Sequence, residues 1–393
     1  MPRQPEGSVW PIDGALEPGA AQGNSPFAAY VHVPFCTVRC GYCDFNTYTT
    51  GFGEGADLET YADAVIREIE FSGSILSRRA LESVFFGGGT PSLLAPEAVG
   101  RILAALEEAF GIAEGAEVTL EANPETLDRE RAQQFANAGV NRFSIGMQSA
   151  VPHVLAILDR THNPENVPRA VAAAKAAGCQ VSVDLIYGAP GETLADWEAS
   201  VREAIGMHPD HISAYSLIIE EGTKMGRELA AGLIPPSDGD LDAQKYELAD
   251  SLLAEADFHW YEISNFSTGE ETRSTHNLAY WRDWDWWGYG PGAHSHVAGQ
   301  RWWNVKHPRA YAGRVLQGLS PGFAGETLSE EDRRVEAVML GIRTSEGMDG
   351  LDPAVVADLA RDGLVDVVEG DRAVLTLKGR LLADLVTRTL LGW

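Results

Sequence analysis

Short runs of apolar and β-branched residues alternate with longer helical patterns between residues 27 and 220. Strands are expected at residues 28–33, 81–86, 117–121, 142–145, 180–186 and 211–217, and helices at 58–76, 96–110 and 165–177. Repeated strand-then-helix units favour a parallel sheet with right-handed crossovers. Six units are fewer than the eight of a closed barrel. The pattern therefore predicts an α/β fold, either a partial (β/α)6 barrel or a doubly wound sheet.

The rest of the chain divides into three further segments. Residues 1–26 are expected to form a flexible arm, and they contain no apolar stretch typical of a signal peptide. Residues 221–324 lose the regular alternation and carry many aromatic residues, which we expect to be mainly core packing. Residues 325–393 predict helix, helix, two short strands and helix, the order of a winged-helix-like α+β module.

The charge of the chain limits its partners. The formal net charge is −27, and residues 325–393 hold 14 acidic against 8 basic residues. Such acidity disfavours nucleic acid, including DNA at the C-terminal module. No run of 18 apolar residues occurs, so direct membrane insertion is not expected. The oligomeric state stays open.

Three of the four cysteines lie within eight residues, directly after the first predicted strand. Cys36, Cys40 and Cys43 follow the spacing C-x3-C-x2-C, whereas Cys179 stands alone and is expected in the core. Three thiolates on one loop can each bind one iron of a cubane cluster. Such clustering indicates a metal site in a reducing, cytoplasmic setting.

A zinc site or three free thiols would also account for this cysteine spacing. Structural zinc needs four ligands, and its cysteine pairs are usually separated by a longer loop. His32 is available nearby, but it lies within the predicted strand. Three buried free thiols without a metal are less expected at this spacing.

The stretch from Tyr30 to Phe45, YVHVPFCTVRCGYCDF, resembles the radical S-adenosylmethionine (SAM) signature. Within that superfamily it is similar to the oxygen-independent coproporphyrinogen III oxidases and to the HemW heme chaperones. The resemblance implies a [4Fe–4S] cluster on the three cysteines. Its open iron would bind the amino and carboxylate groups of SAM, and one electron would then generate a 5′-deoxyadenosyl radical.

Further candidate residues lie in or just after the predicted strands, near the ends at which a barrel would place its active site. The family uses matching positions for SAM, which implies that role for Tyr30, Gly88, Gly89, Thr90, Glu121, Gln148, Arg160 and Asp184. A glycine loop allows close backbone approach to a ligand, a carboxylate suits an ammonium or ribose hydroxyls, and arginine suits a carboxylate. Taken singly, each polar residue is better explained as a hydrogen-bonded strand end or helix cap. Glu121, Gln148 and Asp184 on three successive predicted strands, after the cysteine and glycine loops, favour the shared SAM role.

Three features bear on the choice between oxidase and chaperone. The oxidases carry a fourth cysteine two residues after the third, where this chain has Phe45. They also have a long N-terminal arm, whereas only 29 residues precede Tyr30. Finally, the sequence from His276 to Trp281 matches an H-N-x-x-Y-W motif associated with heme binding in HemW proteins. Imidazole is a good ligand for heme iron.

The resemblance therefore implies a heme chaperone that carries a SAM-ligated cluster, binds heme through His276 and delivers it to acceptor proteins, for which the family implies respiratory heme proteins. An oxygen-independent coproporphyrinogen III oxidase, which decarboxylates propionates oxidatively, is the alternative. A radical SAM enzyme acting on another substrate is a further one. No residue is singled out as catalytic, and His294 and His296 receive no role.

Overall fold

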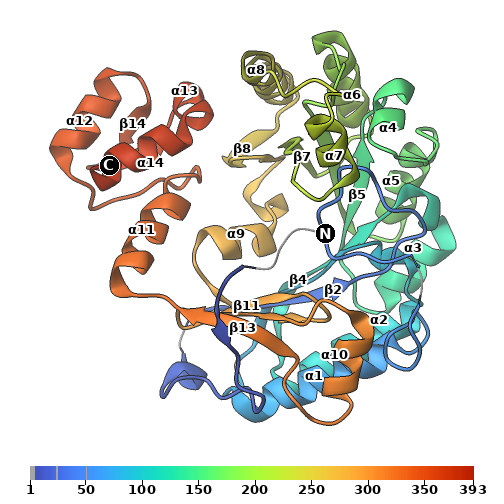
Figure 1. Cartoon of the computed structure of the whole chain (residues 1–393). Helices are drawn as coiled ribbons and strands as arrows, with labels where there is room; N and C mark the ends of the chain where they lie inside the picture. The colour runs from blue at the N-terminus through green and yellow to red at the C-terminus, as the bar shows by residue number, and fades with distance from the viewer. Residues whose placement is uncertain (1–4, 24, 50) are drawn as a thin grey trace.

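Six parallel strands, with helices between consecutive strands, form the centre of the molecule (Figure 1). The computed structural model describes residues 5–23, 25–49 and 51–393. The strands are β2 (Phe27–Val33), β3 (Leu81–Gly88), β4 (Ile112–Ala122), β5 (Arg142–Gln148), β6 (Gln180–Tyr187) and β7 (His211–Ser216). They pair in sequence order and in parallel. The predicted series of strand–helix units is confirmed.

The helices pack outside this sheet, as Figure 1 shows. They are α1 (Tyr61–Ile75), α2 (Pro96–Ala109), α3 (Arg129–Asn137), α4 (Pro152–Ile157), α5 (Asn166–Ala176), α6 (Leu194–Gly206), α7 (Lys224–Ala230) and α8 (Gly239–Glu255), with short 3-10 helices at η1 (Ala20–Gln22), η2 (Pro91–Leu93), η3 (Pro124–Thr126) and η4 (Glu270–Thr272). Their ends follow local chemistry: in α6, Thr193 and Asp196 form a capping box. In β2 six of the seven residues are buried, as expected for a strand covered on both faces.

The segment 221–324 is more regular than its sequence suggests, because it supplies strands to both edges of the sheet. β10 (Asp285–Tyr289) runs parallel to β2, with Trp286 opposite Ala28. Antiparallel strands β11 (His294–Val297), β12 (Gln300–Asn304) and β13 (Gly322–Thr327) follow it, with α10 (Pro308–Val315) between the last two. At the opposite edge lie β9 (Asn265–Ser267) and β8 (His259–Glu262). Trp287, Trp302 and Trp303 are buried within strands, so this part of the aromatic tract is core packing, whereas Trp284 and Trp286 are half-buried.

The N-terminal segment differs from the loose arm expected for residues 1–26. β1 (Ser8–Val9) pairs with β13 and extends the sheet by one strand. The indole of Trp10 stacks on Trp302 with ring centroids 4.8 Å apart. A Cβ atom at Gly322 would lie 2.3 Å from the Trp10 ring, so glycine makes room for the indole there. Aromatic stacking over a glycine-lined strand thus attaches the segment to the sheet.

The last part of the chain stands apart from the large sheet, at the upper left in Figure 1. Its elements are α11 (Glu330–Gly341), α12 (Pro353–Arg361), β14 (Val365–Val368), β15 (Arg372–Leu375), α13 (Leu377–Leu381) and α14 (Ala383–Leu391). The two strands form a separate sheet, and Ile342, Leu359 and Val386 belong to a separate apolar cluster. The order of elements is the one expected for residues 325–393.

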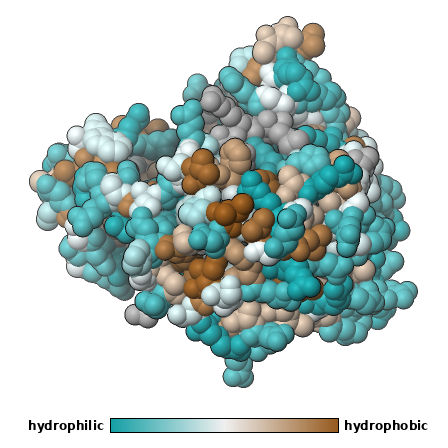
Figure 2. Space-filling view, turned by 60° about the horizontal axis from the view of Figure 1, so that its bottom comes forward, coloured by the Kyte–Doolittle hydropathy of each residue, from teal (hydrophilic) through white to brown (hydrophobic). Residues whose placement is uncertain are grey.

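The surface mixes polar and apolar side chains, and on the face shown in Figure 2 hydrophobic ones gather near the centre. Among the helices of the described ranges, none combines the length and the apolar character that a bilayer crossing requires.

Candidate functional site

A cavity of about 490 Å³ lies inside the parallel sheet, at the carboxyl ends of its strands. One wall is the cysteine loop, which we define as residues 34–48. The opposite wall comes from the strand ends of β4 to β7 and the residues that follow them. Active sites of parallel barrels lie at this end of the strands.

The three cysteines all line the cavity and are half-buried, free thiols. The Thr90 hydroxyl donates to Cys36 Sγ at 3.6 Å, and Arg160 Nη1 donates to Cys40 Sγ at 3.7 Å. Burial raises the pKa of Cys36 to about 11 and also raises the pKa of Cys43, so a bound cation would be needed to hold these groups as thiolates.

The donor set suits an iron–sulfur cluster better than a single ion. Across the described parts of the chain, no three Cys, His, Asp or Glu side chains converge closely enough to hold one metal ion. A cubane cluster instead takes each thiolate on a different iron, so its ligands need not meet at one point. Three cysteines around one cavity suit the cluster, whereas a structural zinc ion would need a fourth ligand.

The cysteine loop is fastened at its far end to strands that occur much later in the sequence. Asn46 is buried, and its Nδ2 donates to Pro291 O at 2.9 Å and to Lys306 O at 2.8 Å. Asn46 O in turn accepts a hydrogen bond from His32 Nε2 at 2.9 Å. The β10–β12 region thus positions the loop that carries the predicted cluster ligands.

The glycine loop after β3 packs directly against the cysteine loop. Gly89 N donates to Val33 O and Thr90 N donates to Phe35 O, each at 2.8 Å. A Cβ atom at Gly89 would lie 2.6 Å from Phe35 O, and Gly88 has a φ of +105°. Glycine is required at both positions, for close approach and for a left-handed backbone respectively. All three predicted residues, Gly88, Gly89 and Thr90, line the cavity.

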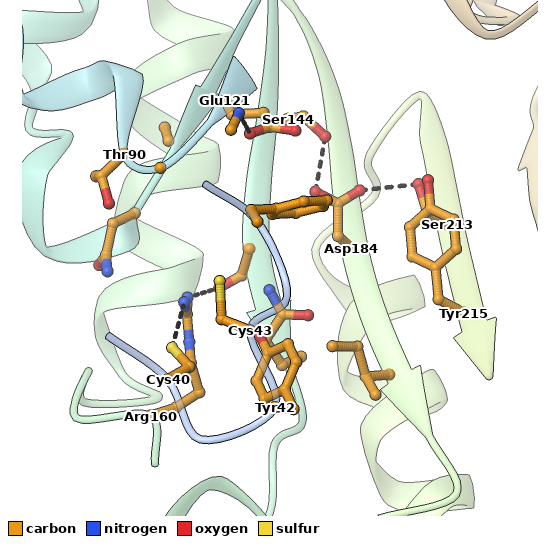
Figure 3. A pocket seen from close by; sticks show the side chains of 18 of the residues that line it. Cys40, Tyr42, Cys43, Thr90, Glu121, Ser144, Arg160, Asp184, Ser213 and Tyr215 are labelled. Carbon is orange, nitrogen blue, oxygen red and sulfur yellow. Dashed lines mark hydrogen bonds between the residues drawn. The ribbon is translucent and has the colours of Figure 1, made fainter. Parts of the chain in front are cut away.

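Two carboxylates, Glu121 and Asp184, line the cavity at the side opposite the cysteines (Figure 3). Gly88 N donates to Glu121 Oε2 at 3.0 Å. Asp184 accepts from the Ser144 hydroxyl at 2.7 Å and from the Ser213 hydroxyl at 2.8 Å. Burial, followed by repulsion from Asp184, raises the pKa of Glu121 to about 8. This wall therefore favours a ligand that carries positive charge.

Gln148 and Arg160 also line the cavity, as predicted. Gln148 ends β5 with a φ of +66°, a conformation that is unusual outside glycine and is often associated with functional sites. Arg160 Nη2 donates to Gly146 O at 2.9 Å, while its Nη1 points to Cys40. The Arg160 guanidinium thus lies beside a predicted cluster ligand, where it suits an anionic group.

Tyr30 does not line the cavity in this structure. Its hydroxyl is 3.0 Å from His32 Nδ1, and its ring packs against Phe85, with centroids 6.2 Å apart. His32 donates to Asn46 O through Nε2, so Nδ1 accepts from the Tyr30 hydroxyl. Tyr30 therefore supports the cysteine loop through His32. The expected direct contact between Tyr30 and SAM is not supported by this position, because Tyr30 does not line the cavity.

His276 differs more strongly from its expected role as a free heme ligand. It lies in α9 (Thr275–Trp281), is 1% exposed, and stacks on Phe85 with centroids 4.9 Å apart. Its Nδ1 is 2.9 Å from the Ser83 hydroxyl and its Nε2 is 3.0 Å from the Tyr280 hydroxyl. Both ring nitrogens are therefore occupied, and burial lowers the His276 pKa to about 3. Heme ligation by His276 would require at least one of these two hydrogen bonds to break.

Sequence reasoning missed the inward-facing residues deeper in the cavity. Alternate positions on successive strands point into it, listed here by strand as Thr119 and Glu121, Arg142 and Ser144, Ser182 and Asp184, His211 and Ser213. Thr119 Oγ1 and His211 Nδ1 are buried without a protein hydrogen-bond partner. Because side chains alternate in direction along a strand, Thr119 and Ser182 could have been found two positions before the predicted residues Glu121 and Asp184. β7 holds no predicted ligand, so this periodicity does not reveal His211 and Ser213.

Comparisons with known proteins agree with this geometry. Residues 30–204 match the family model of the radical SAM superfamily. A Mycobacterium tuberculosis (strain H37Rv) protein named heme chaperone HemW is 44% identical over 95% of this chain and 97% of its own length. Heme chaperone HemW of Bacillus subtilis is 32% identical over 93% of this chain and 99% of its own length.

Among solved structures, coproporphyrinogen III oxidase (HemN) from Escherichia coli superposes with a TM-score of 0.80, covering 98% of this chain and 96% of that one. The two sequences are 22% identical, so this likeness concerns the fold. It agrees with a radical SAM barrel followed by a C-terminal module.

Proposed function

This chain belongs to the HemW family of the radical SAM superfamily, and on that premise we propose that it is a heme chaperone that binds heme and passes it to acceptor proteins. The main support is the 44% identity to a heme chaperone HemW over 95% of the chain. Phe45 adds to it, because the oxidases that this family resembles have a cysteine at that position. Respiratory heme proteins are the proposed acceptors, and the reduced thiols suit the cytoplasm.

The cavity residues fit the cofactors that the family implies. Cys36, Cys40 and Cys43 would hold a [4Fe–4S] cluster, leaving one iron open. When bound, this cluster supplies a coordination site and an electron for SAM. Arg160, which contacts Cys40, would pair with the SAM carboxylate, and Glu121 would face the positive charge of SAM. Asp184, oriented by Ser144 and Ser213, would accept from ligand hydroxyls.

Coproporphyrinogen III oxidation is the second candidate, supported by the fold shared with HemN. One assay separates the two functions. Reconstituted protein is incubated anaerobically with SAM, a reductant and coproporphyrinogen III. The chaperone proposal expects no protoporphyrinogen, and formation of that product at catalytic turnover would overturn it.

A heme titration tests the proposal directly. Protein with a measured iron and acid-labile sulfide content is titrated with heme, and transfer is then followed to an apo-protein acceptor such as a heme-free cytochrome. We expect saturable binding and transfer faster than from free heme. Absence of any saturable heme uptake would favour radical SAM chemistry on another substrate.

A further inference from the structure

Four apolar side chains that line the cavity are also strongly exposed to solvent. They are Val38 (48% exposed) and Phe45 (56%) on the cysteine loop, and Ile218 (70%) and the ring of Tyr215 (40%), whose hydroxyl is buried, at and just after the end of β7. A residue that both lines a cavity and reaches solvent lies at its opening. We call these four residues the mouth patch. Exposed apolar groups around a cavity are characteristic of ligand-binding surfaces.

The two halves of the mouth patch are held together by the structure beneath them. Met225 N donates to Gly41 O at 3.0 Å, which joins the segment after β7 to the cysteine loop. Below the patch, Tyr42 packs against an apolar cluster that includes Leu217 and Met225. The patch is therefore a supported apolar surface, and its exposure is not the result of an isolated loop.

The size of the cavity indicates which ligand the patch receives. A volume of about 490 Å³ suits one small-molecule ligand, and the carboxylates, Arg160 and the cysteines fit SAM there. Heme is larger than SAM, flat and apolar on both faces, so it cannot share the interior with SAM. His276 offers heme no free nitrogen. Contact with a face of heme at the opening of the cavity needs neither a free His276 nitrogen nor space beside SAM.

Building on the proposed function, we propose that the mouth patch binds heme by its flat face, with the macrocycle covering the SAM cavity. The heme propionates would point to Arg39, whose guanidinium lies beside Phe45 O at 3.4 Å and lines the same cavity. Asp44, which adjoins Phe45, and Glu220 also line the cavity, and their carboxylates would weaken the contact between the propionates and Arg39. Contact through a face, without a strong axial bond, suits a carrier that must release its heme.

The first test measures heme affinity of full-length, cluster-containing protein with SAM bound. The variants Ile218→Ser and Val38→Ser are compared with Leu233→Ser and Val367→Ser, which remove side chains that are 75% and 48% exposed away from the cavity. We expect each mouth variant to weaken heme binding about tenfold, the scale for covering one aliphatic side chain, and the controls to bind like the wild type. Ile218 lies outside the cysteine loop, so its result does not depend on an intact cluster.

The second test asks what part of heme is recognised. Iron-free protoporphyrin IX should compete with heme, because face contacts do not need the metal. A folded His276→Gln protein should bind heme with the affinity of the wild type. Failure of protoporphyrin IX to compete would overturn the inference. Loss of heme binding in His276→Gln, together with normal binding by Ile218→Ser, would also overturn the inference. In both of these cases the proposed function of heme carriage would stand. Absence of heme binding by the wild type would overturn both.

Discussion

SAM binding is expected to remove a proton from Glu121. Burial and the neighbouring Asp184 raise the Glu121 pKa to about 8. With that value only about 10% of Glu121 is ionised at pH 7. If the carboxylate must be ionised to face the positive charge of SAM, affinity at pH 7 is about tenfold weaker than at pH 9, which corresponds to about 1.4 kcal/mol.

The sign of the pH effect follows from the same values. Raising the pH from 6 towards 8 ionises Glu121 before SAM arrives, so SAM binds more tightly, and the gain levels off above the pKa. Below that range SAM binds more weakly, because the proton must be removed on binding. Near pH 7 each SAM bound should release about 0.9 proton.

Calorimetric titration with SAM, in buffers of different ionisation enthalpy, measures both the affinity for SAM and the number of protons released on binding. Glu121→Gln should bind SAM more weakly than the wild type at pH 9, with no pH dependence and no proton release. Glu114→Gln, on the exposed part of β4, is the matched control and should behave like the wild type. A wild-type affinity that stays constant from pH 6.5 to 8.5, or a pH dependence that survives in Glu121→Gln, would refute the reasoning.

Three further outcomes are expected. Without ligands, the raised pKa makes Glu121 destabilising as the pH rises from its unfolded pKa of about 4.5 towards 8. Glu121→Gln should therefore gain on the order of 5 kcal/mol over the wild type in urea unfolding at pH 8.5 and little at pH 4.5. An equal change at both pH values would contradict this reasoning. Substituting Cys36, Cys40 or Cys43 by Ala should abolish the iron–sulfur absorbance after reconstitution, whereas Cys179→Ala should retain it; loss in all four would mean misfolding. Trp10→Ala should expose residues 5–23 to rapid proteolysis, because it removes the stacking on Trp302. Val9→Ser, at an 89% exposed position, should not. Equal cleavage of both variants would argue against anchoring by stacking.

Much of the fold could be predicted because the parallel strands are buried, and their sequences are therefore short continuous runs of apolar residues. β2, β3 and β6 begin within one residue of their expected positions. β10 was missed for a physical reason: its pairing of Trp286 with Ala28 joins residues far apart in sequence, and the local pattern is too rich in tryptophan to distinguish strand from core. Such non-local partners leave no periodic signal.

The site shows the same division between local and non-local information. Spacing alone locates the cysteines, and strand ends locate Glu121 and Asp184. Local sequence information does not reveal that Ser83 and Tyr280 hydrogen-bond to the two ring nitrogens of His276. Ser83 lies in a strand almost two hundred positions earlier in the chain. A motif gives the residue type, whereas the hydrogen-bond partners decide whether the residue is available.

The fastening of the cysteine loop by Asn46 has a consequence for how the protein is made. The loop is synthesised early, but its anchors, Pro291 O and Lys306 O, and the β10 partner of β2 come from the last third of the chain. While the ribosome is still translating the central region, β2 is an edge strand, and the loop that carries the three cysteines lacks its hydrogen bonds to Pro291 O and Lys306 O. The cluster site would therefore be fully folded only after most of the polypeptide has left the ribosome. Iron–sulfur assembly factors would then insert the cluster late in maturation.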